Sequence, residues 1–577
     1  MKKSTIKRLW GYIGRYKLQL IVVFLFALIG NTLYIFTPLL TGQAIDKIIG
    51  VGNVDFNGLV ILLIKLLIIY VLSSLFQWLM SVVSSVAANN TIHDIRKDAF
   101  NKLNTLPLKY YDNHSHGDVI SRLTNDIDAI SDGLFQGITQ VMSAVVIIAG
   151  CFIFMLTISP LITLIVVFIT PLCFFIASFI AKHSRKMFAK QSQTVGELNG
   201  FVEEMIGNQK IVKAFGYEDR AYKSFKEIND RLYKAGQKAQ WYSSLTNPTT
   251  RLVNNIAYVS VTIIGGFLAL AAKLSIGNIA SFLNYSNQFA KPINEITSIT
   301  SQIQAAFASA ERVFALLDEE PEIPVNVPEA ELKDCQGRVS FNGVSFSYRP
   351  EVPLIKNLNL EVEKGNMVAI VGPTGSGKTT LVNLLMRFYD INGGEIKIDG
   401  TNIYQVNRDN LRQTIGMVLQ ESWLFSGTVA DNISYGKPEA TRAEIIEAAK
   451  AAKAHSFISK LPNGYDTIID EDGGNLSQGQ KQLLTIARVL IIDPPMLILD
   501  EATSSIDTRT EINIQKAFSK MMEGKTSFII AHRLSTIKEA DIILVLKNGD
   551  IIEQGSHEEL LQKKGFYHTL YYSQFAV

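Results

Sequence analysis

Cysteine is scarce in this sequence of 577 residues, which contains three, at Cys151, Cys173 and Cys335. They lie far apart, without the short spacing of metal ligands, and two of them fall in apolar runs. A cysteine in such a run is expected to be a small buried apolar residue. The scarcity of cysteine therefore argues against a disulfide framework and against a cysteine-based metal site.

Charge is also sparse, and neither sign prevails. Charged residues make up 19% of the chain, and 55 basic against 53 acidic residues leave a formal net charge of +2. A protein that coats nucleic acid has a strong excess of basic residues, so nucleic acid is excluded as a general partner. The length is too great for one hydrophobic core, and two or more domains are expected.

Long apolar runs, in contrast, are abundant in the first half of the sequence. Several are long enough to cross a hydrocarbon core of about 30 Å as a helix that rises about 1.5 Å per residue. The last two contain asparagine and glutamine, whose amides usually face the interior of a helix bundle in a membrane. We therefore predict an α-helical bundle of six membrane spans, near residues 19–40, 58–85, 133–157, 160–181, 252–272 and 277–300.

The basic residues between these runs predict the orientation of the spans. Lysine and arginine gather in the N-terminal segment, between Arg96 and Arg122, and between Lys182 and Arg251, whereas the other loops hold few. Because basic loops stay on the cytoplasmic side, both termini are expected in the cytoplasm. The first apolar run lacks a small-residue cleavage site, which predicts a retained anchor. The two long basic connections have helical periodicity, so their helices are expected to continue beyond the membrane.

The composition changes at residues 318–334, DEEPEIPVNVPEAELKD, where acidic residues and three prolines replace the apolar periodicity. Proline cannot continue a helix, so this stretch is the predicted domain boundary. We assign residues 1–316 to a transmembrane domain with two cytoplasmic loops, 317–337 to a linker and 338–577 to an α/β domain.

The second domain contains a phosphate-binding loop in its expected setting. The apolar segment MVAIV, 367–371, predicts a buried strand that leads into GPTGSGKT, 372–379, and a helix. The glycines let backbone N–H groups turn toward phosphate oxygens, Lys378 reaches the β and γ phosphates, and the Thr379 hydroxyl can ligate Mg²⁺. The predicted nucleotide-binding residues here are Gly372, Pro373, Thr374, Gly375, Ser376, Gly377, Lys378, Thr379 and Thr380.

A second apolar strand is predicted at MLILDE, 496–501, and it ends in two carboxylates. Asp500 is predicted to hold Mg²⁺, directly or through water, and Glu501 to orient and deprotonate the attacking water. The expected chemistry is therefore hydrolysis of ATP with Mg²⁺ as cofactor.

The stretch NLSQGQKQLLTIAR, 475–488, predicts a helix whose start meets another molecule. Ser477 and Gln480 have the spacing of a capping box, Gly479 allows close approach to the backbone, and an apolar-periodic helix follows. A helix N-terminus attracts an anion. The residues predicted to face it are Ser477, Gln478, Gly479 and Gln480.

These motifs resemble the ATP-binding-cassette (ABC) exporters along the whole chain. Residues 106–130 and 203–219 are similar to the two intracellular coupling loops of that family. The resemblance implies that Tyr348 stacks on adenine and that Gln420 senses Mg²⁺ and the attacking water. It also implies that Asp507 lies in the loop that crosses the dimer interface and that His532 contacts the γ phosphate. The implied catalytic set is Lys378, Gln420, Glu501 and His532, and the implied metal set is Thr379, Gln420 and Asp500.

The helix start at 475–480 resembles the family's signature motif, LSGGQ, with Gln478 in place of a glycine. In the family two cassettes close head to tail, so each signature faces the γ phosphate of ATP on the other cassette. One membrane domain and one cassette without an internal repeat predict half of a dimer. Complete catalytic motifs beside an altered signature resemble one half of heterodimeric bacterial exporters. A second half-transporter is therefore the favoured partner, and a homodimer is the alternative.

The resemblance implies ATP-driven efflux of amphipathic or hydrophobic compounds across a bacterial cell membrane, by ATP-induced cassette closure and alternating access. Membrane lipids and a small amphipathic substrate are the other expected partners. A homodimeric lipid or peptide exporter and a nucleotide-gated channel or regulator are the alternative functions. An importer is disfavoured because importers of the family usually keep the two domains on separate chains. A soluble cassette ATPase that acts on DNA is excluded by the spans.

Overall fold

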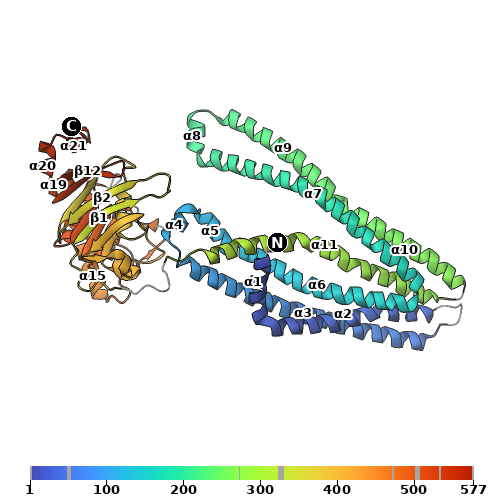
Figure 1. The fold of residues 1–577 in the computed structure, drawn as a ribbon. Helices are drawn as coiled ribbons and strands as arrows, with labels where there is room; N and C mark the ends of the chain where they lie inside the picture. Colours follow the sequence, from blue (N-terminus) through green and yellow to red (C-terminus); the bar gives the residue numbers. More distant parts are fainter. Residues whose placement is uncertain are drawn as a thin grey trace. The chain divides into compact units, whose positions relative to one another are not determined.

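The computed structural model describes residues 3–48, 54–271, 273–322, 330–420, 422–470, 473–500, 507–531 and 534–574. The chain forms two compact units: Met1–Asn104 with Ser115–Glu319, and Thr105–His114 with Glu320–Val577. The first unit is helical and the second is built around β-sheets (Figure 1). The predicted fold class, apolar helices followed by an α/β domain, is confirmed. The predicted domain limits stay predictions.

The first unit consists of helices, several of them very long. Helices α3 and α7 contain 48 residues each. That corresponds to about 72 Å at about 1.5 Å per residue, more than twice the thickness of a hydrocarbon core. These helices are therefore long enough to continue beyond a membrane. The helices of this unit are α1 Lys3–Ile13, α2 Lys17–Asp46, α3 Phe56–Leu103, α5 His116–Leu123, α6 Asn125–Ile158, α7 Pro160–Gly207, α8 Gln209–Ala214, α9 Glu218–Ser244, α10 Thr246–Leu270 and α11 Ile276–Asp318.

Among the described residues, four helical stretches are long and apolar enough to cross a membrane: Ser4–Asp46, Phe56–Leu103, His116–Ile158 and Arg251–Leu270. A shorter apolar stretch, Pro160–Ile169, lies in α7. The predicted spans 160–181 and 277–300 fall within α7 and α11. Side chains are described for only some residues of these two stretches. The number of six spans therefore stays a prediction.

Helix α3 shows the surface that a membrane would cover. Its first half presents large apolar side chains outward, and an aqueous surface rarely carries so many in one continuous band. The exposed residues are Val60, Ile61, Leu63, Ile64, Leu67, Ile68, Val71 and Leu75.

Helices α2 and α11 approach each other closely. Gly42 and Gly277 face one another so tightly that a Cβ atom on Gly277 would lie 2.1 Å from the carbonyl oxygen of Gly42. Only glycine permits this approach. Farther along the contact, the Tyr285 hydroxyl donates a hydrogen bond of 2.9 Å to the carbonyl oxygen of Ile35. The pair therefore packs backbone to backbone at one point and through a buried tyrosine at another.

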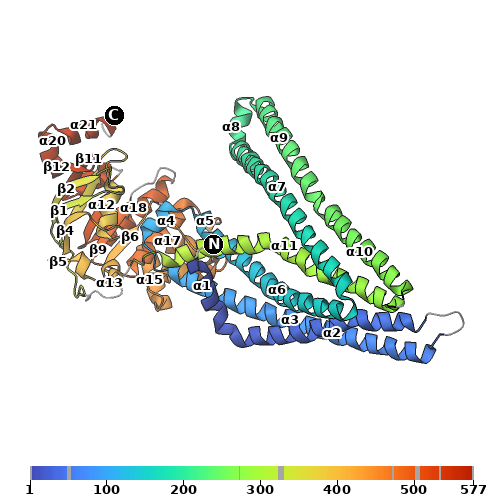
Figure 2. The ribbon, with the colours of Figure 1, turned by 45° about the vertical axis from the view of Figure 1, so that its right-hand side comes forward.

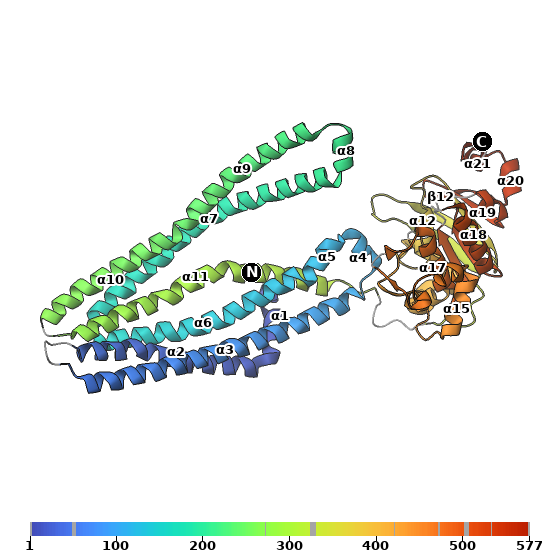
Figure 3. The same cartoon turned by 180° about the vertical axis from the view of Figure 1, so that it is seen from behind.

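Each of the two predicted coupling loops contains a short helix. Helix α4, Leu108–Asn113, lies in the first loop and belongs to the second unit. Helix α8, Gln209–Ala214, lies in the second loop. It connects the ends of α7 and α9, which lie side by side (Figures 2 and 3).

The second unit contains two main sheets. A four-stranded antiparallel sheet has the order β2-β1-β4-β5, and a six-stranded sheet has the order β12-β11-β3-β10-β9-β6. In the larger sheet β3, β10, β9, β6 and β11 run parallel, and β12 is antiparallel to β11. The strands are β1 Val339–Phe346, β2 Ile355–Val362, β3 Met367–Val371, β4 Gly393–Ile398, β5 Thr401–Asn402, β6 Ile415–Val418, β7 Gly427–Thr428, β8 Ile468–Ile469, β9 Met496–Asp500, β10 Thr526–Ile530, β11 Ile542–Lys547 and β12 Asp550–Gly555.

Two apolar cores hold this unit together. One fills the space between the two sheets and α12, and the other lies around the helices that include α15, α17 and α18. The parallel strands β3, β9 and β10 are buried along nearly their whole length, as expected for strands covered on both faces. The helices are α12 Lys378–Leu385, α13 Arg408–Gln413, α14 Val429–Ser434, α15 Arg442–Ala451, α16 His455–Ile458, α17 Gln478–Leu490, α18 Thr508–Met522, α19 Leu534–Glu539, α20 His557–Gln562 and α21 Phe566–Gln574.

Candidate nucleotide-binding site

Three parallel strands bring the predicted motifs to one edge of the larger sheet. Strand β10 lies between β3 and β9, and Ile530 pairs with Ile370 on one side and with Asp500 on the other. The carboxyl ends of parallel strands share an edge, where α/β proteins bind ligands. The loop that follows β3 and the carboxylate that ends β9 therefore lie at the same edge, on either side of β10.

The loop after β3 has the conformation that its glycines allow. Gly372, Gly375 and Gly377 have φ angles of 153°, 80° and 100°, which side chains with a Cβ atom rarely adopt. A Cβ atom on Gly372 would also lie 2.3 Å from the carbonyl oxygen of Leu546. The third of these glycines directly precedes α12, so the loop opens into a helix N-terminus. Backbone N–H groups at such a terminus attract phosphate.

Lys378 is the first residue of α12, and its ammonium group folds back over the loop. Its Nζ atom donates hydrogen bonds to the carbonyl oxygens of Gly372 at 2.9 Å and Pro373 at 3.1 Å. Burial lowers the pKa of Lys378, and the negative charge of Asp500 acts in the opposite direction. A partly buried ammonium group gains from an added anion, so this lysine is suited to compensate phosphate charge.

Hydroxyl groups complete the loop. Ser376 is 2% exposed, and its Oγ atom has no hydrogen-bond partner. A buried hydroxyl without a partner is costly, so a ligand that accepts its hydrogen bond would fit here. Thr379 is exposed at the start of α12. These features fit a nucleoside triphosphate with Mg²⁺, whose ligands in such loops are a hydroxyl, phosphate oxygens and water. Among the described residues no cluster of three His, Cys, Asp or Glu side chains offers a metal site of another kind.

Tyr348 follows strand β1 and lies beside α12. Its hydroxyl is 3.2 Å from Oγ1 of Thr380. Its ring meets the ring of Phe346 edge-on at 4.9 Å between centroids, and it is 43% exposed. A partly exposed aromatic ring fixed beside the phosphate-binding helix can stack on a nucleotide base.

The signature stretch forms the predicted helix start. Helix α17 begins at Gln478, with Ser477 as its N-cap. The Ser477 hydroxyl accepts a hydrogen bond of 3.4 Å from the Gln480 backbone N–H, and the Gln480 side chain accepts one of 3.0 Å from the Ser477 N–H. The predicted capping box is therefore present. The Gln478 side chain is exposed at this start, and Gly479 is buried.

The remaining predicted residues are placed as follows. Gln420 is exposed just after strand β6, which pairs with β9. Asp507 is the N-cap of α18 and accepts a hydrogen bond of 3.0 Å from the Thr510 N–H, which lowers the pKa of Asp507. Glu501 and His532 lie outside the described residues. The strands that precede them, β9 and β10, end at Asp500 and Ile530.

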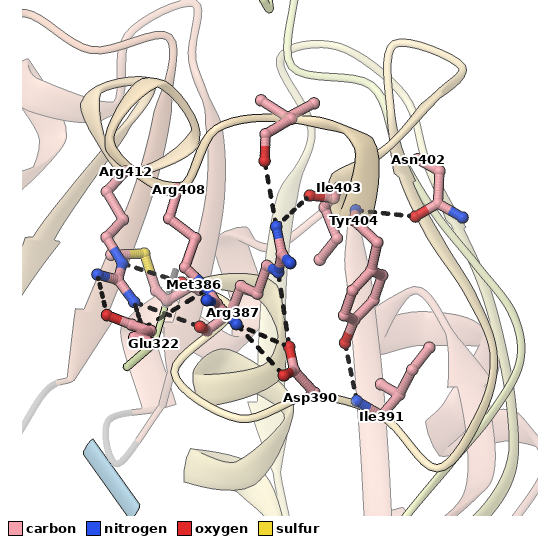
Figure 4. Close-up of polar contacts among 11 residues, drawn as sticks. Glu322, Met386, Arg387, Asp390, Ile391, Asn402, Ile403, Tyr404, Arg408 and Arg412 are labelled. Atoms are coloured by element: carbon pink, nitrogen blue, oxygen red, sulfur yellow. Dashed lines mark hydrogen bonds and ion pairs between the residues drawn. The ribbon is translucent and has the colours of Figure 1, made fainter. Parts of the chain in front are cut away.

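Sequence reasoning missed two groups of residues around the end of α12. Tyr389 contacts both Tyr348 and Asp112 of α4. A cluster of three arginines and two carboxylates lies near the end of α12: Glu322, Arg387, Asp390, Arg408 and Arg412 (Figure 4). The contacts join residues up to 277 positions apart, so no local pattern signals them.

The chain matches two family models. One, described as the ABC transporter transmembrane region, matches residues 20–293, and the other, described as ABC transporter, matches residues 355–504. The two matches fall in the helical part and in the α/β part of the chain, and they carry the family's membrane region and cassette on one polypeptide.

Curated relatives match almost the whole chain. The uncharacterized ABC transporter ATP-binding protein YfiC of Bacillus subtilis is 43% identical over 99% of this chain and 94% of its own length. A fatty acid ABC transporter ATP-binding/permease protein of Mycobacterium bovis is 44% identical over 93% of this chain and 84% of its own length. A putative multidrug export ATP-binding/permease protein of Staphylococcus aureus is 36% identical over 98% of this chain and 99% of its own length. The chain therefore belongs to the ABC transporter family, as an exporter-type half-transporter that couples ATP hydrolysis to transport across a membrane.

Proposed function

We propose that this half-transporter uses ATP with Mg²⁺ to move amphipathic or hydrophobic compounds out of a bacterial cell. It does so as one half of a dimer in the cell membrane, with both termini in the cytoplasm. The observation that carries the proposal is the phosphate loop after β3. Its glycines have positive φ angles, Ser376 has an unpartnered buried hydroxyl, and Lys378 and Asp500 lie together at the sheet edge.

The residues of the loop and of the neighbouring motifs have separate roles in this proposal. Lys378 compensates the β and γ phosphates, and Ser376 donates to a phosphate oxygen. Tyr348 stacks on the adenine ring. Thr379, Gln420 and Asp500 would hold Mg²⁺, which when bound neutralises phosphate charge during transfer to water. Glu501 is the general base and His532 contacts the γ phosphate, by resemblance to the family.

The test compares two active-site variants with a matched control in proteoliposomes. Lys378→Ala is expected to weaken ATP binding at least about tenfold, because the phosphate charge loses its compensating ammonium group. Glu501→Gln is expected to keep ATP binding and lower hydrolysis at its own site at least about a hundredfold. Lys460→Ala removes an exposed lysine of the same unit and serves as the control.

The transport assay follows efflux of a fluorescent amphipathic dye under ATP. Dye movement against its gradient that stops in Lys378→Ala and continues in the control would support an export pump. ATP-dependent equilibration of the dye without uphill movement would instead support a nucleotide-gated channel. ATP affinity unchanged in Lys378→Ala would contradict the assignment of the loop.

The substrate class follows from chemistry shared by the relatives' names. One relative is named for multidrug export and another for fatty acids. Fatty acids and many drugs are apolar molecules with a polar end, and such molecules partition into membranes. Hydrophobic or amphipathic compounds are therefore the proposed cargo of this chain.

The proposed partner is a second, different half-transporter. Gln478 adds an exposed side chain at the first position of α17, where the family signature has glycine. A side chain there restricts the approach of the nucleotide bound to the opposite cassette. We propose that this signature closes a site that mainly retains ATP. The hydrolytic site is then formed by this chain's phosphate loop, Glu501 and His532 with the partner's signature.

Two measurements separate a heterodimer from a homodimer. The first is the oligomeric state and ATPase activity of the chain expressed alone. A stable homodimer with full coupled activity and two equivalent hydrolytic sites would contradict the heterodimer. The second is the ATPase activity of Gln478→Gly expressed alone. It should exceed the activity of the unchanged chain expressed alone if the glutamine hinders closure. Activity that needs a second half-transporter would support the proposal.

A further inference from the structure

A small aromatic cluster surrounds the tyrosine assigned to the base. The rings of Tyr348 and Tyr389 meet edge-on, with 4.9 Å between centroids and an interplanar angle of 86°. Phe346 contacts both rings, at 4.9 Å and 5.8 Å. Edge-to-face rings at these distances attract each other and fix each other's orientation. The orientation of Tyr348 therefore depends on Tyr389.

Tyr389 has a second contact, on a different element. Its hydroxyl donates a hydrogen bond to Oδ2 of Asp112, in the short helix α4 of the first coupling loop. Burial and this carboxylate raise the pKa of Tyr389, so the hydroxyl keeps its proton at neutral pH and remains a donor. A hydrogen bond from a neutral hydroxyl to a carboxylate is charge-assisted and stronger than one between neutral groups. One side chain thus touches both the base-stacking tyrosine and α4.

The backbone that carries Tyr389 is anchored next to the phosphate-binding helix. Helix α12 ends at Leu385, and Arg387 has a φ angle of 51°. The carbonyl oxygens of Met386 and Arg387 accept hydrogen bonds from Arg412 at 3.4 Å and 3.3 Å (Figure 4). The segment between α12 and Tyr389 is therefore held in place. A displacement of Tyr348 therefore acts on the Tyr389 side chain, which contacts α4 through Asp112.

We propose that Tyr389 is a positioning residue that connects occupancy of the base site with helix α4. Its ring holds Tyr348 in the orientation that stacks on adenine, and its hydroxyl holds Asp112. The inference rests on the proposed ATP site, in which Tyr348 contacts the base. It adds a residue outside the phosphate loop and the signature, and it assigns separate tasks to the ring and to the hydroxyl of Tyr389.

The two tasks can be separated by two substitutions in the full chain in lipid nanodiscs. Tyr389→Phe keeps the ring and removes the hydroxyl, so ATP affinity should change less than about twofold. Tyr389→Leu removes the ring, and ATP affinity should fall about three- to tenfold, the range expected for loss of an aromatic pair. Affinity for inorganic triphosphate, which has no base, should stay within about twofold in both variants. A general defect of the fold would lower both affinities together.

The link to α4 is read by hydrogen exchange of the amides of Leu108–Asn113, with and without ATP in the presence of EDTA to prevent turnover. The wild type is expected to show an ATP-dependent change in exchange there. Tyr389→Phe should lose at least about half of that change while it still binds ATP. Asp112→Ala removes the acceptor and should have the same effect, and the double variant should be no worse than either single variant, because both substitutions remove the same contact.

Two further variants make the outcomes distinct. Tyr465→Phe removes another hydroxyl of the second unit, 2.8 Å from Nδ1 of His455, and should leave the change at α4 intact. Tyr348→Ala should weaken ATP about tenfold, since stacking on an aromatic ring is lost. If Tyr348→Ala leaves ATP affinity unchanged, the proposed base site fails and this inference falls with it. If Tyr348→Ala weakens ATP but Tyr389→Phe keeps the wild-type change at α4, or the wild type shows none, this inference alone is overturned.

Discussion

Removal of the Glu322 carboxylate should destabilise the cassette, because Arg412 loses its carboxylate partner and Arg408 keeps only Asp390 (Figure 4). Glu322 is hydrogen-bonded to Arg412 through both carboxylate oxygens, and its side chain is 15% exposed. Arg408 is 8% exposed, lies 3.6 Å from the same carboxylate through Nε, and also pairs with Asp390. Loss of one partner from a fully buried pair costs about 3–5 kcal/mol. Partial exposure and the remaining Asp390 reduce the expected cost of Glu322→Ala to about 2 kcal/mol.

The assay is thermal unfolding of the full chain followed by the fluorescence of Trp423. The chain contains four tryptophans, and Trp10, Trp78 and Trp241 are largely exposed, so their replacement by phenylalanine leaves Trp423 as the reporter in the second unit. For a domain of this size about 1 kcal/mol shifts the midpoint by about 2–4 °C, which predicts a decrease of roughly 4–8 °C.

A matched control removes a glutamate whose ion pair is exposed. Glu331 lies 3.5 Å from Lys333, and the two side chains are 62% and 82% exposed. Its replacement by alanine should cost less than about 0.5 kcal/mol. Glu322→Gln keeps an acceptor oxygen for Arg412 and should fall between the two. A midpoint for Glu322→Ala within about 1 °C of that for Glu331→Ala would refute this reasoning.

Three further predictions concern single positions in the second unit. Gly372→Ala should abolish measurable ATP binding, because the new Cβ atom would lie 2.3 Å from the Leu546 carbonyl oxygen. Gly375→Ala has open space around the new Cβ atom and should cost only about 1 kcal/mol of backbone strain, so equal ATP affinities in the two variants would contradict this prediction. Ser477→Ala should lower the unfolding free energy by about 1 kcal/mol through loss of the capping box, measured by the same fluorescence assay, and no change would argue against the cap. Burial raises the pKa of Cys335 from 9.0 to about 11, which lowers its thiolate fraction at pH 7.5 about a hundredfold, so iodoacetamide should alkylate Cys335 far more slowly than a free thiol. The alkylation rate should rise with pH up to about 11, and a rate that levels off near pH 9 would contradict the shift.

The parts of the fold that the sequence predicted depend on local patterns. The capping box at Ser477, the glycine loop after β3 and the apolar strands are each specified by residues within about ten positions of one another. Their positions in the structure agree with the predicted segments. Parallel pairing then brings Asp500 beside the loop, which follows from the general rule for the carboxyl ends of such strands.

The rest depends on contacts between distant segments, which single-sequence patterns do not carry. Arg412 lies 90 residues from Glu322, and Tyr389 lies 277 residues from Asp112. Arg412 lies on a short helix and Tyr389 follows a helix, and residues in such positions can pair with many different partners. The partner is fixed only when the distant segments come together in the folded chain. The close contact of Gly42 with Gly277 was unpredictable for the same reason, since glycine in a helix has no fixed packing partner.

The grouping of α4 with the cassette has a consequence for how the chain is made. The ribosome synthesises Asp112 well before Tyr389, and a separation of 277 residues takes roughly 15–55 s at about 5–20 residues per second. During that time α4 has left the ribosome, while Tyr389 and the aromatic cluster around it have not yet been synthesised. The second unit therefore includes a segment, Thr105–His114, that is synthesised well before the rest of that unit. A cassette expressed from residue 320 onward would lack α4, and the Tyr389 hydroxyl would then lack the Asp112 carboxylate as its acceptor.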